Sequence, residues 1–384
     1  MRIAIDLTAL LPEATGVDNF LKNLVLNLGK VDESNRYRVF VNYEDRHLFH
    51  GMLPGNFSVA PFSLQPRWVR LFFQQVALPS AARLWGADVV HSPSFIMPFY
   101  RGRARHVLTV HDMTFFSVPH CHIPLRRSAL YRRAVSESIR RADLVTVPSR
   151  ATQQAVLHLM PELSPGRVRT IAPGIGAEFR LCHSEQVRGV LDRLRLPHSY
   201  ILYVGTIEPR KNLERLVESY RRLIASGAIS EHLVLAGRLG WGYKGLLAQL
   251  DSPELRGRVH LTGYITQSDL PCLYAGATLF VYPSLQEGFG FPPLEAMACE
   301  VPTISSLSSS LVENLQGAAE LVPPDDIDAL ADAMRRLLQD MLVRAECREK
   351  GLVRAAMFRW EETARQTLDC YNALASGQFG RRRA

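Results

Sequence analysis

Two glutamates, Glu287 and Glu295, stand eight positions apart in the run Glu-Gly-Phe-Gly-Phe-Pro-Pro-Leu-Glu. Pro292 and Pro293 lack amide protons and suit only the first turn of a helix, and the glycines interrupt any helix that reaches back to Glu287. The run therefore predicts a loop followed by a helix, with one carboxylate on each. Carboxylates accept paired hydrogen bonds from sugar hydroxyls, whereas loop amides and a helix N-terminus suit a phosphate. A hydroxyl-rich, anionic ligand fits this chemistry.

A second account of the pair needs no ligand. Two glutamates at this spacing occur by chance in many helical proteins, and Glu295 alone could be an acidic residue that complements the helix dipole. The elements that must position the two side chains decide between these accounts.

Short apolar runs predict β-strands along the whole chain. They lie at 2–6, 38–42, 88–92, 106–112, 144–149, 168–173, 200–205, 232–237, 259–263, 279–284 and 303–306. Amphipathic helical stripes lie between many of them, for example Leu213, Leu216, Val217, Tyr220, Leu223 and Ile224, and Ile327, Leu330, Met334, Leu337, Leu338 and Met341. Alternating strands and helices predict doubly wound parallel α/β sheets, in which ligands bind beyond the carboxyl ends of strands. Polar loops follow four of the strand ends, at Gly205, Gly237, Gly263 and Ser284.

The chain has 384 residues, which is more than one hydrophobic core usually serves, so two domains are expected. Its six cysteines form no Cys-x-x-Cys pair, which argues against a zinc site and a disulfide framework and favours a reducing cytoplasm. Asp6 interrupts the first apolar run, so this run predicts a strand rather than a signal peptide. No apolar stretch approaches the ~20 residues of a membrane span.

Charge is distributed unevenly along the chain. Residues 1–180 contain 22 Lys and Arg against 13 Asp and Glu, whereas residues 181–384 contain 23 against 24. This asymmetry predicts an anionic partner for the first half, with nucleic acid and an anionic membrane surface as candidates. A basic face that is merely solvated is the other interpretation.

The run from Glu287 to Glu295 resembles the Glu-x7-Glu signature of retaining glycosyltransferases with the GT-B fold, the family 4 type that includes many bacterial mannosyltransferases. The resemblance covers nearly the whole chain. It implies two Rossmann-like α/β domains that face each other across a cleft, with acceptor binding at 1–175 and nucleotide-sugar binding at 176–357. Residues 358–384 would form a helix that crosses back to the first domain, followed by a basic tail at 381–383.

The resemblance also implies how the diphosphate is bound. The loop after Gly205 resembles the family's diphosphate loop, in which Lys211 would stabilise the charge that develops on the leaving group. A solvated helix start is the alternative for this lysine. Many relatives have Arg directly after the first glycine, where this chain has Thr206, so Arg210 or Arg238 would supply the second positive charge.

The rest of the donor site follows from the same resemblance. Backbone groups near Gly263 and Tyr264 would hold the nucleobase, although an ordinary strand end explains these residues nearly as well. Glu295 would bind the ribose hydroxyls, and Glu287 would orient the transferred sugar. The amides that assist Glu287 would be those of Gly288, Phe289, Gly290 and Phe291.

The first half resembles the family's acceptor side. Gly16 resembles an early glycine loop near the donor phosphates, or it serves a turn before a helix. His111 would hydrogen-bond the transferred sugar, and Asp112 would orient that sugar or the acceptor hydroxyl. A lone histidine at a strand end is more often structural, but a carboxyl end favours function. With Lys211 and Glu287, these two residues are the predicted catalytic residues.

The predicted reaction moves a hexose from a nucleotide-diphosphate donor, first of all GDP-mannose, to a glycan or polyprenyl-diphosphate-linked glycan in cell-surface polysaccharide synthesis. Front-face attack with retention is expected. No cofactor is expected, and the predicted reaction does not require a metal. A sugar-nucleotide epimerase of the same fold and a basic nucleic-acid-binding protein are the alternatives. No recognition helix or stacking-aromatic motif is recognisable, so we expect no nucleic-acid partner.

The segment 67–76 mixes basic, aromatic and aliphatic residues. As a helix it could lie on anionic lipid with Trp68 and Phe72 at the interface, which would suit a lipid-linked acceptor. This interpretation predicts a cytoplasmic protein that is peripheral on the inner face of the cell membrane. The other interpretation packs the apolar residues onto the sheet, namely Val69, Phe72, Phe73 and Val76.

Overall fold

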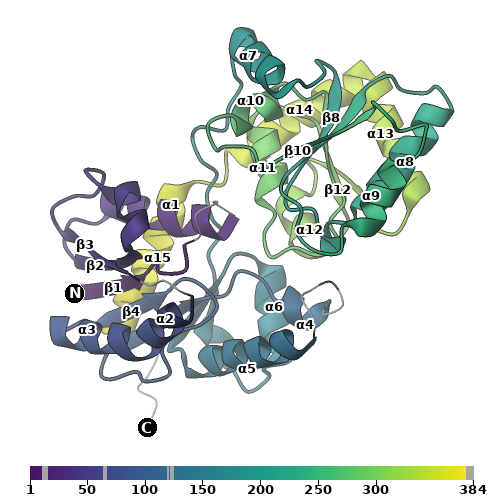
Figure 1. Ribbon diagram of the computed structural model, residues 1–384. Coiled ribbons are helices and arrows are strands. Elements are labelled where there is room, and N and C mark those ends of the chain that lie inside the picture. The colour runs from purple at the N-terminus through teal and green to yellow at the C-terminus, as the bar shows by residue number, and fades with distance from the viewer. Residues whose placement is uncertain (11–15, 64–66, 119–120, 122–124, 378–384) are drawn as a thin grey trace. The chain divides into compact units, whose positions relative to one another are not determined.

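The computed structural model of the protein describes residues 1–10, 16–63, 67–118, 121 and 125–377 (Figure 1). The chain divides into two compact units. Unit 1 comprises Met1–Phe116, Pro124–Gly174 and Arg359–Ala384, and unit 2 comprises Ser117–Ile123 and Ile175–Phe358. The basic tail expected at 381–383 lies outside the described residues.

Unit 1 is built on a parallel sheet of seven strands in the order β3-β2-β1-β4-β5-β6-β7. These strands are β1 (Arg2–Asp6), β2 (Arg36–Asn42), β3 (Phe57–Phe62), β4 (Val89–Ser92), β5 (Arg105–Thr109), β6 (Leu144–Val147) and β7 (Val168–Thr170). Strands β4 and β6 are buried along their whole length, as expected for a parallel sheet covered on both faces.

The helices of unit 1 form two layers on this sheet. They are α1 (Gly16–Val31), α2 (Arg67–Phe72), α3 (Leu78–Trp85), α4 (Thr114–Ser117), α5 (Leu125–Arg141), α6 (Arg150–Leu159) and α15 (Trp360–Ala375). Helices α1 and α15 pack against each other on one face, and α3 and α5 lie on the opposite face (Figure 1).

Helix α15 belongs to unit 1 although unit 2 precedes it in the chain. Its Tyr371 is fully buried, and the hydroxyl lies 2.6 Å from Nδ1 of His91. Nε2 of His91 lies 2.9 Å from Oγ1 of Thr109, so helix and sheet share one buried polar network. At the start of the helix, Trp360 contacts the ring of Phe20 on α1 at 5.8 Å.

Unit 2 repeats the same architecture with six parallel strands in the order β10-β9-β8-β11-β12-β13. The strands are β8 (Tyr200–Val204), β9 (His232–Ala236), β10 (Val259–Gly263), β11 (Leu279–Tyr282), β12 (Thr303–Ser306) and β13 (Glu320–Val322). The helices are α7 (Ser184–Leu194), α8 (Leu213–Ala225), α9 (Lys244–Leu250), α10 (Leu270–Ala275), α11 (Phe291–Ala298), α12 (Ser309–Leu315), α13 (Ile327–Gln339) and α14 (Met341–Ala355). Helices α8, α9 and α13 cover one face, and α10, α11 and α14 cover the other (Figure 1).

The prediction of two doubly wound parallel sheets is confirmed, and every strand predicted from the sequence is present. Two strands were not predicted, β3 and β13, and each forms an edge of its sheet. The helix predicted to continue to Met341 ends instead at Gln339. Asp340 begins a new helix there by accepting hydrogen bonds from the amides of Leu342 and Val343, and Met341 is exposed.

The segment 67–76 only partly follows either interpretation of its sequence. Val69 and Phe73 pack against the core of unit 1, whereas Phe72 and Val76 are 62% and 49% exposed. The prediction that Phe72 and Val76 pack onto the sheet is therefore wrong. The side chain of Trp68 lies outside what the structure describes. Within the described residues, no helix is both long and apolar enough to cross a membrane.

Candidate functional site

The candidate site of unit 2 lies where the strand order reverses. Strands β8 and β11 are neighbours, but the chain continues from β8 to β9 on one side and from β11 to β12 on the other. In open α/β sheets the loops at such a reversal diverge and bind ligands beyond the carboxyl ends of the strands. The loop after β8 carries Lys211, and the loop after β11 carries Glu287.

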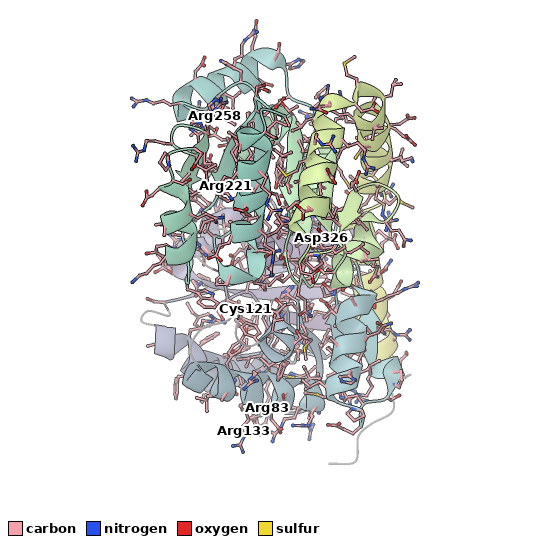
Figure 2. The ribbon with its side chains drawn as sticks, turned by 90° about the vertical axis from the view of Figure 1, so that its right-hand side faces the viewer. Arg83, Cys121, Arg133, Arg221, Arg258 and Asp326 are labelled. Carbon is pink, nitrogen blue, oxygen red and sulfur yellow. The ribbon has the colours of Figure 1, made fainter. Side chains whose placement is uncertain are left out.

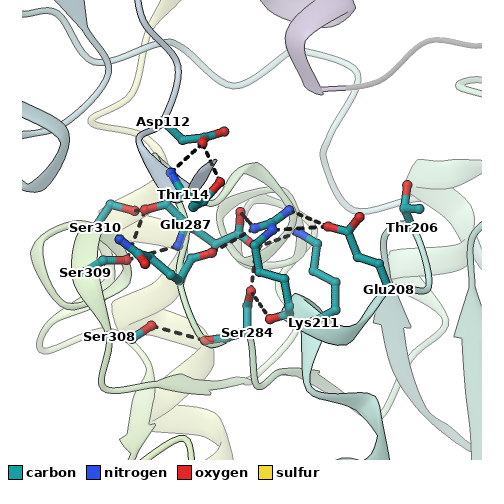
Figure 3. Close-up of polar contacts among 12 residues, drawn as sticks. Asp112, Thr114, Thr206, Glu208, Lys211, Ser284, Glu287, Ser308, Ser309 and Ser310 are labelled. Atoms are coloured by element: carbon teal, nitrogen blue, oxygen red, sulfur yellow. Dashed lines mark hydrogen bonds and ion pairs between the residues drawn. The ribbon is translucent and has the colours of Figure 1, made fainter. Parts of the chain in front are cut away.

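The structure brings these two predicted residues into direct contact (Figure 3). Nζ of Lys211 lies 2.5 Å from Oε1 of Glu287. The same carboxylate oxygen accepts hydrogen bonds from the hydroxyls of Tyr282, at 2.9 Å, and Ser284, at 2.7 Å. Lys211 also donates to the Tyr282 hydroxyl at 2.7 Å. The lysine is therefore held in one position by a carboxylate and a phenol.

Arg210 completes this group as a second cation. Its guanidinium lies 2.7 Å from Oε2 of Glu287 and 2.8 Å from Oε1 of Glu208. The group thus contains two cationic side chains and two carboxylates, and each of these side chains is at most 17% exposed. Buried charges are tolerated only when they are paired in this way.

The neighbouring charges set the protonation of the pair. Burial acts to raise the pKa of Glu287, but the charges of Arg210 and Lys211 outweigh burial and hold this pKa well below its usual range. Burial and the charge of Arg210 lower the pKa of Lys211, while Glu287 acts in the opposite direction. Glu287 is consequently an ionised carboxylate of low basicity at neutral pH.

Serines from the start of α12 hold the backbone of Glu287. The hydroxyl of Ser309 accepts a hydrogen bond from the backbone amide of Glu287 and donates one to the backbone carbonyl of Glu287, both at 3.0 Å. Ser310 donates to the same carbonyl at 2.9 Å. Ser308 occupies the N-cap position of α12, but its hydroxyl donates to the carbonyl of Ser284 instead of capping the helix.

Glu295 has a different environment, although the same loop and helix carry it. It lies in α11, is 7% exposed, and accepts a 2.9 Å hydrogen bond at Oε2 from the hydroxyl of Tyr274. Burial raises the pKa of Glu295 to about 7, although the hydrogen bond from Tyr274 favours the carboxylate. The carboxyl group is therefore partly protonated near neutral pH in the unliganded protein.

Glycines let the loops at the strand ends approach one another. Gly237 has φ +149°, and a Cβ atom on it would lie 2.0 Å from the carbonyl oxygen of Gly205. The amide of Gly205 donates to Ala236, and the amide of Gly237 donates to Gly263. Side chains at these glycines would push apart the loops that carry Lys211 and Arg238.

The loop before α11 has the predicted form. Gly290 has φ +92° at the N-cap of α11, and a Cβ atom there would lie 2.5 Å from Leu311. Phe289 is 4% exposed, and its ring contacts Phe291 at 5.0 Å. The phenyl group of Phe289 therefore belongs to the core, and its carbonyl accepts a 2.7 Å hydrogen bond from the side-chain amide of Asn314.

Arg238 and Tyr264 lie on the next two loops along the sheet. The carbonyl of Arg238 accepts a hydrogen bond from the amide of Ile207, so this loop runs beside the loop of Lys211. Tyr264 follows β10 and is 42% exposed. Each of them follows a strand end at the same edge of the sheet as Glu287.

In unit 1, His111 and Asp112 follow the carboxyl end of β5, which ends at Thr109 and not, as predicted, at 112. Nε2 of His111 donates to the carbonyl of Pro93 at 2.8 Å, and the ring makes edge contacts with Phe20 and Phe95. Burial lowers the pKa of His111, so the neutral imidazole is favoured and Nδ1 carries a lone pair.

Asp112 has one oxygen engaged within its own loop. Its Oδ1 accepts hydrogen bonds from the amide of Thr114, at 2.9 Å, and from the Thr114 hydroxyl, at 2.5 Å. Burial raises the pKa of Tyr131 most, and the charge of Asp112 raises it further. The charge of Arg70 acts in the opposite direction. Tyr131 and Arg70 are thus electrostatic neighbours that the sequence did not single out.

Gly16 begins helix α1 and is exposed. Residues 11–15 lie outside the described part of the chain, so the predicted early glycine loop is described only from Gly16 onward. Four residues later, Phe20 contacts His111 with ring centroids 4.9 Å apart. Helix α1 and the loop after β5 therefore meet at one edge of unit 1.

Known protein families match both units. The family described as "Glycosyltransferase Family 4" matches residues 14–179, and the family "Glycosyl transferases group 1" matches residues 193–354. The O-antigen chain mannosyltransferase B of Escherichia coli is 33% identical over 287 residues, which cover 74% of this chain and 74% of that protein. A serotype-specific mannosyltransferase of Escherichia coli, WbdA, is 27% identical over 362 residues, which cover 89% of this chain but 43% of that longer protein.

Solved structures show the same fold. HepE from Anabaena, determined in complex with UDP and glucose, superposes with a TM-score of 0.77 at 18% identity, covering 97% of this chain and 100% of that one. The two parallel sheets are those of GT-B glycosyltransferases, and the family match decides against the epimerase and nucleic-acid alternatives. The chain belongs to the family 4 glycosyltransferases and is itself a glycosyltransferase.

Proposed function

We propose that this glycosyltransferase transfers mannose from GDP-mannose to a glycan or lipid-linked glycan acceptor in the synthesis of a cell-surface polysaccharide. The choice of sugar rests on the relatives, since the curated proteins with 33% and 27% identity are named mannosyltransferases. The choice of acceptor class rests on the O-antigen chain in the name of the first relative.

The observation that carries the proposal is the ion-paired group of Lys211, Arg210 and Glu287 at the strand-order reversal of unit 2. Its two cations are preorganised at the place where α/β sheets bind nucleotides. When a diphosphate approaches, the two cations give up part of their interaction with Glu287 and bind the diphosphate oxygens instead. The lysine then needs little reorganisation to neutralise charge on the leaving diphosphate.

The reaction that we infer is a front-face displacement with retention. The acceptor hydroxyl oxygen bonds to the anomeric carbon on the face from which the diphosphate departs, the bond between that carbon and the phosphate oxygen breaks, and the departing phosphate takes the hydroxyl proton. Glu287 is a poor covalent nucleophile for this reaction, because Lys211 and Arg210 engage its oxygens and its basicity is low. No metal is required in this scheme.

The other predicted residues take supporting roles in the proposal. Glu295 binds the ribose hydroxyls through its carboxylate, and backbone groups near Gly263 and Tyr264 hold the base. Unit 1 binds the acceptor near the loop of His111. There Asp112 orients a hydroxyl of the acceptor.

We also propose that unit 1 contacts anionic lipid. Large apolar side chains are exposed on α2, α3, α5 and the π-helical segment Phe73–Ala77 between α2 and α3, namely Phe72, Val76, Leu84 and Leu130. Figure 2 shows Arg83 of α3 and Arg133 of α5 projecting outward at the same end of unit 1. Apolar side chains flanked by arginines are typical of surfaces that insert shallowly into an anionic membrane.

A thermal-shift panel with GDP, UDP, ADP and their sugars tests the donor, because a ligand that binds only the folded protein raises its melting temperature. GDP and GDP-mannose are expected to give the largest shifts. Transfer is then followed by mass spectrometry with a mannose-terminated glycan acceptor, and the anomeric proton resonance of the first product reports retention. A larger shift with UDP or ADP compounds, or an inverted product, would overturn the donor or the stereochemistry.

Sedimentation with vesicles tests the membrane contact. The protein is expected to pellet with phosphatidylglycerol vesicles and not with phosphatidylcholine vesicles, and Phe72→Asp is expected to remain in the supernatant. Leu352→Asp on α14 of unit 2 is the matched control, because Leu352 is also exposed. Equal pelleting of both variants, or no pelleting of the unaltered protein, would remove the proposal.

A further inference from the structure

The loop that follows β4 contains a strained turn. The amide of Ile96 donates to the carbonyl of Ser94 at 2.5 Å, and the residue between them, Phe95, has φ +52°. The amide of Phe95 donates to the carbonyl of Thr109 on β5 at 2.9 Å. A γ-turn with positive φ is rare and strained, and a bulky residue seldom adopts it. Such a conformation persists only where its surroundings hold it in place.

Two side chains bond to the backbone of this turn, one on each side of it. On one side the carbonyl of Pro93 accepts a hydrogen bond from Nε2 of His111 at 2.8 Å. On the other side the carbonyl of Ile96 accepts one from Nε2 of Gln74 at 3.0 Å. The ring of Phe95 also makes an edge contact with the imidazole, with centroids 5.4 Å apart. A shift of the turn would therefore move two of the groups that fix His111.

Gln74 is itself fixed by a buried carboxylate. Its Nε2 also donates to Oδ2 of Asp6 at 3.0 Å, and Oδ1 of Asp6 accepts from the amide and the hydroxyl of Thr8 at 3.0 and 2.6 Å. Gln74 and Asp6 are 2% and 3% exposed. Asp6 ends β1, which lies beside β4 where the strand order of unit 1 reverses. A chain of buried hydrogen bonds thus runs from the central strand through Gln74 to the turn.

The backbone around Gln74 is also unusual. Gln74 lies in the π-helical segment Phe73–Ala77, and π-helical turns are rare and frequent at functional sites. The next residue, Gln75, bonds to the same loop, because it donates to the carbonyl of Met97 at 3.2 Å and accepts from the amide of Phe99 at 2.9 Å. The π-helical segment therefore fixes the loop after β4 through two consecutive side chains.

We propose that Gln74 is a positioning residue for glycosyl transfer, which holds the turn at Phe95 and, through this turn, the orientation of His111. The effect on transfer rests on the proposed function, in which His111 is a catalytic residue. Gln74 itself contacts the backbone of the loop and the Asp6 carboxylate. Its loss would leave the strained turn without the bond on one side, so the turn would relax and the Pro93 carbonyl would move relative to the imidazole.

Nuclear magnetic resonance of isotope-labelled histidine tests the positioning without any donor. In the unaltered protein His111 is expected to be the neutral tautomer with its proton on Nε2, because the Pro93 carbonyl can only accept. His111→Ala identifies the resonances by their loss. Gln74→Met is expected to mix the two tautomers. Gln153→Met, which removes a 2.7 Å hydrogen bond to the carbonyl of Val168 elsewhere in unit 1, is the matched control and is expected to leave them unchanged.

Unchanged His111 resonances in folded Gln74→Met would overturn the proposal. Gln75→Met is the second variant if Gln74→Met does not fold, because it frees the same loop while Asp6 keeps its partners. It is expected to change the His111 resonances in the same direction and by a smaller amount. If Gln74→Met does not fold and Gln75→Met leaves these resonances unchanged, the proposal is overturned as well.

Steady-state kinetics at equal concentrations of folded protein then tests the effect on transfer. Gln74→Met is expected to lower kcat by about 10- to 100-fold, because a misplaced catalytic group slows the reaction even where binding is intact. The apparent KM for the donor is expected to change less than about threefold, since the donor loops belong to unit 2 and Gln74 to unit 1. A kcat within about twofold of the unaltered protein would overturn the role in transfer.

A double-mutant cycle tests whether Gln74 acts through His111. In the His111→Ala background, Gln74→Met is expected to lower kcat by less than about twofold, because the group that it positions is already gone. Full additivity of the two substitutions would overturn the proposal. If the unaltered protein transfers no sugar, the proposed function fails, and the resonances of His111 still decide whether Gln74 holds the imidazole.

Discussion

Lys211 and Glu287 form one buried ion pair, 2.5 Å between Nζ and Oε1, although they come from loops 76 residues apart. The parallel pairing of β8 with β11 makes this contact possible, because it places the two strand ends side by side. Both side chains are buried, so the loss of either one would leave the other as a buried charge without this partner. Each residue therefore contributes to stability as well as to chemistry.

Removal of the lysine should affect turnover more than binding. Lys211→Ala deletes the cation that meets the diphosphate as its charge develops, and we expect kcat to fall by about 10²–10³-fold. The apparent KM for the donor should change far less, as steady-state kinetics can show. Lys244→Ala, which alters an exposed lysine of the same unit, should behave like the unaltered protein. A rise in KM with kcat unchanged would contradict the role of Lys211.

Neutralisation of the glutamate should separate binding from transfer. Glu287→Gln keeps the shape of the side chain but removes the charge that pairs with Arg210 and Lys211, while the ion pair of Arg210 with Glu208 remains. Affinity for GDP should therefore be maintained or rise, while transfer falls. The free energy of unfolding should drop by about 3 kcal/mol, because one partner of a buried ion pair is gone. A loss of GDP affinity in calorimetry would show that Glu287 binds the nucleotide directly.

Binding of the nucleotide-sugar should depend on the ionisation of Glu295. Its pKa is raised to about 7, chiefly by burial and to a smaller extent by the charge of Glu178, while Tyr274 acts against the shift. If only the carboxylate accepts the ribose hydroxyls, affinity is half-maximal at about pH 7, is nearly full about one pH unit higher and falls roughly tenfold per pH unit below about pH 6. A nucleotide-sugar is the proper probe, because its diphosphate has no free terminal phosphate that titrates in this range.

Glu295→Gln should bind the donor weakly and with a flat pH profile in the same titration. Glu300→Gln, which alters a half-buried acid near the end of α11, should keep the slope of the unaltered protein. A slope that persists in Glu295→Gln would assign the titration to another group.

The close approach of two glycines should matter for stability. Gly237→Ala places a methyl group 2.0 Å from the carbonyl of Gly205 and at φ +149°, so we expect a loss of more than about 2 kcal/mol in the free energy of unfolding. Gly189 is an internal control, because it lies in α7 with open space around it. Gly189→Ala should stabilise the protein by about 0.5–1 kcal/mol. Equal melting temperatures of the two variants would contradict the close packing of these loops.

Most of the fold could be predicted because central parallel strands are buried on both faces and read as continuous apolar runs. The two missed strands are edges. Residues of β3 are only half-buried and include Pro61, which an edge tolerates, and β13 is three residues long. The failed prediction at Met341 has a different cause, since an apolar residue fits the helical stripe but Asp340 caps a new helix.

The candidate site could be predicted only where its residues are local in sequence. Glu287, Glu295 and Lys211 lie in motifs that are visible without a fold. The partners that fix them are not local: Tyr274 reaches Glu295 from another helix, and Ser309 reaches the Glu287 backbone from the next strand crossover. Tyrosines in apolar runs and serines before a helix are ordinary core and capping residues until the sheet register aligns them.

Calorimetric titration of GDP-mannose into the unaltered protein and into Glu295→Ala tests the central claim most directly, because the claim is that unit 2 binds a sugar diphosphate through the Glu287-to-Glu295 loop and helix. The account predicts saturable binding of one ligand per chain and its loss in the variant, with the melting temperature of the unliganded variant showing that it is folded. Binding that is unaffected by Glu295→Ala, or no binding of any nucleotide-sugar to the unaltered protein, would contradict the account.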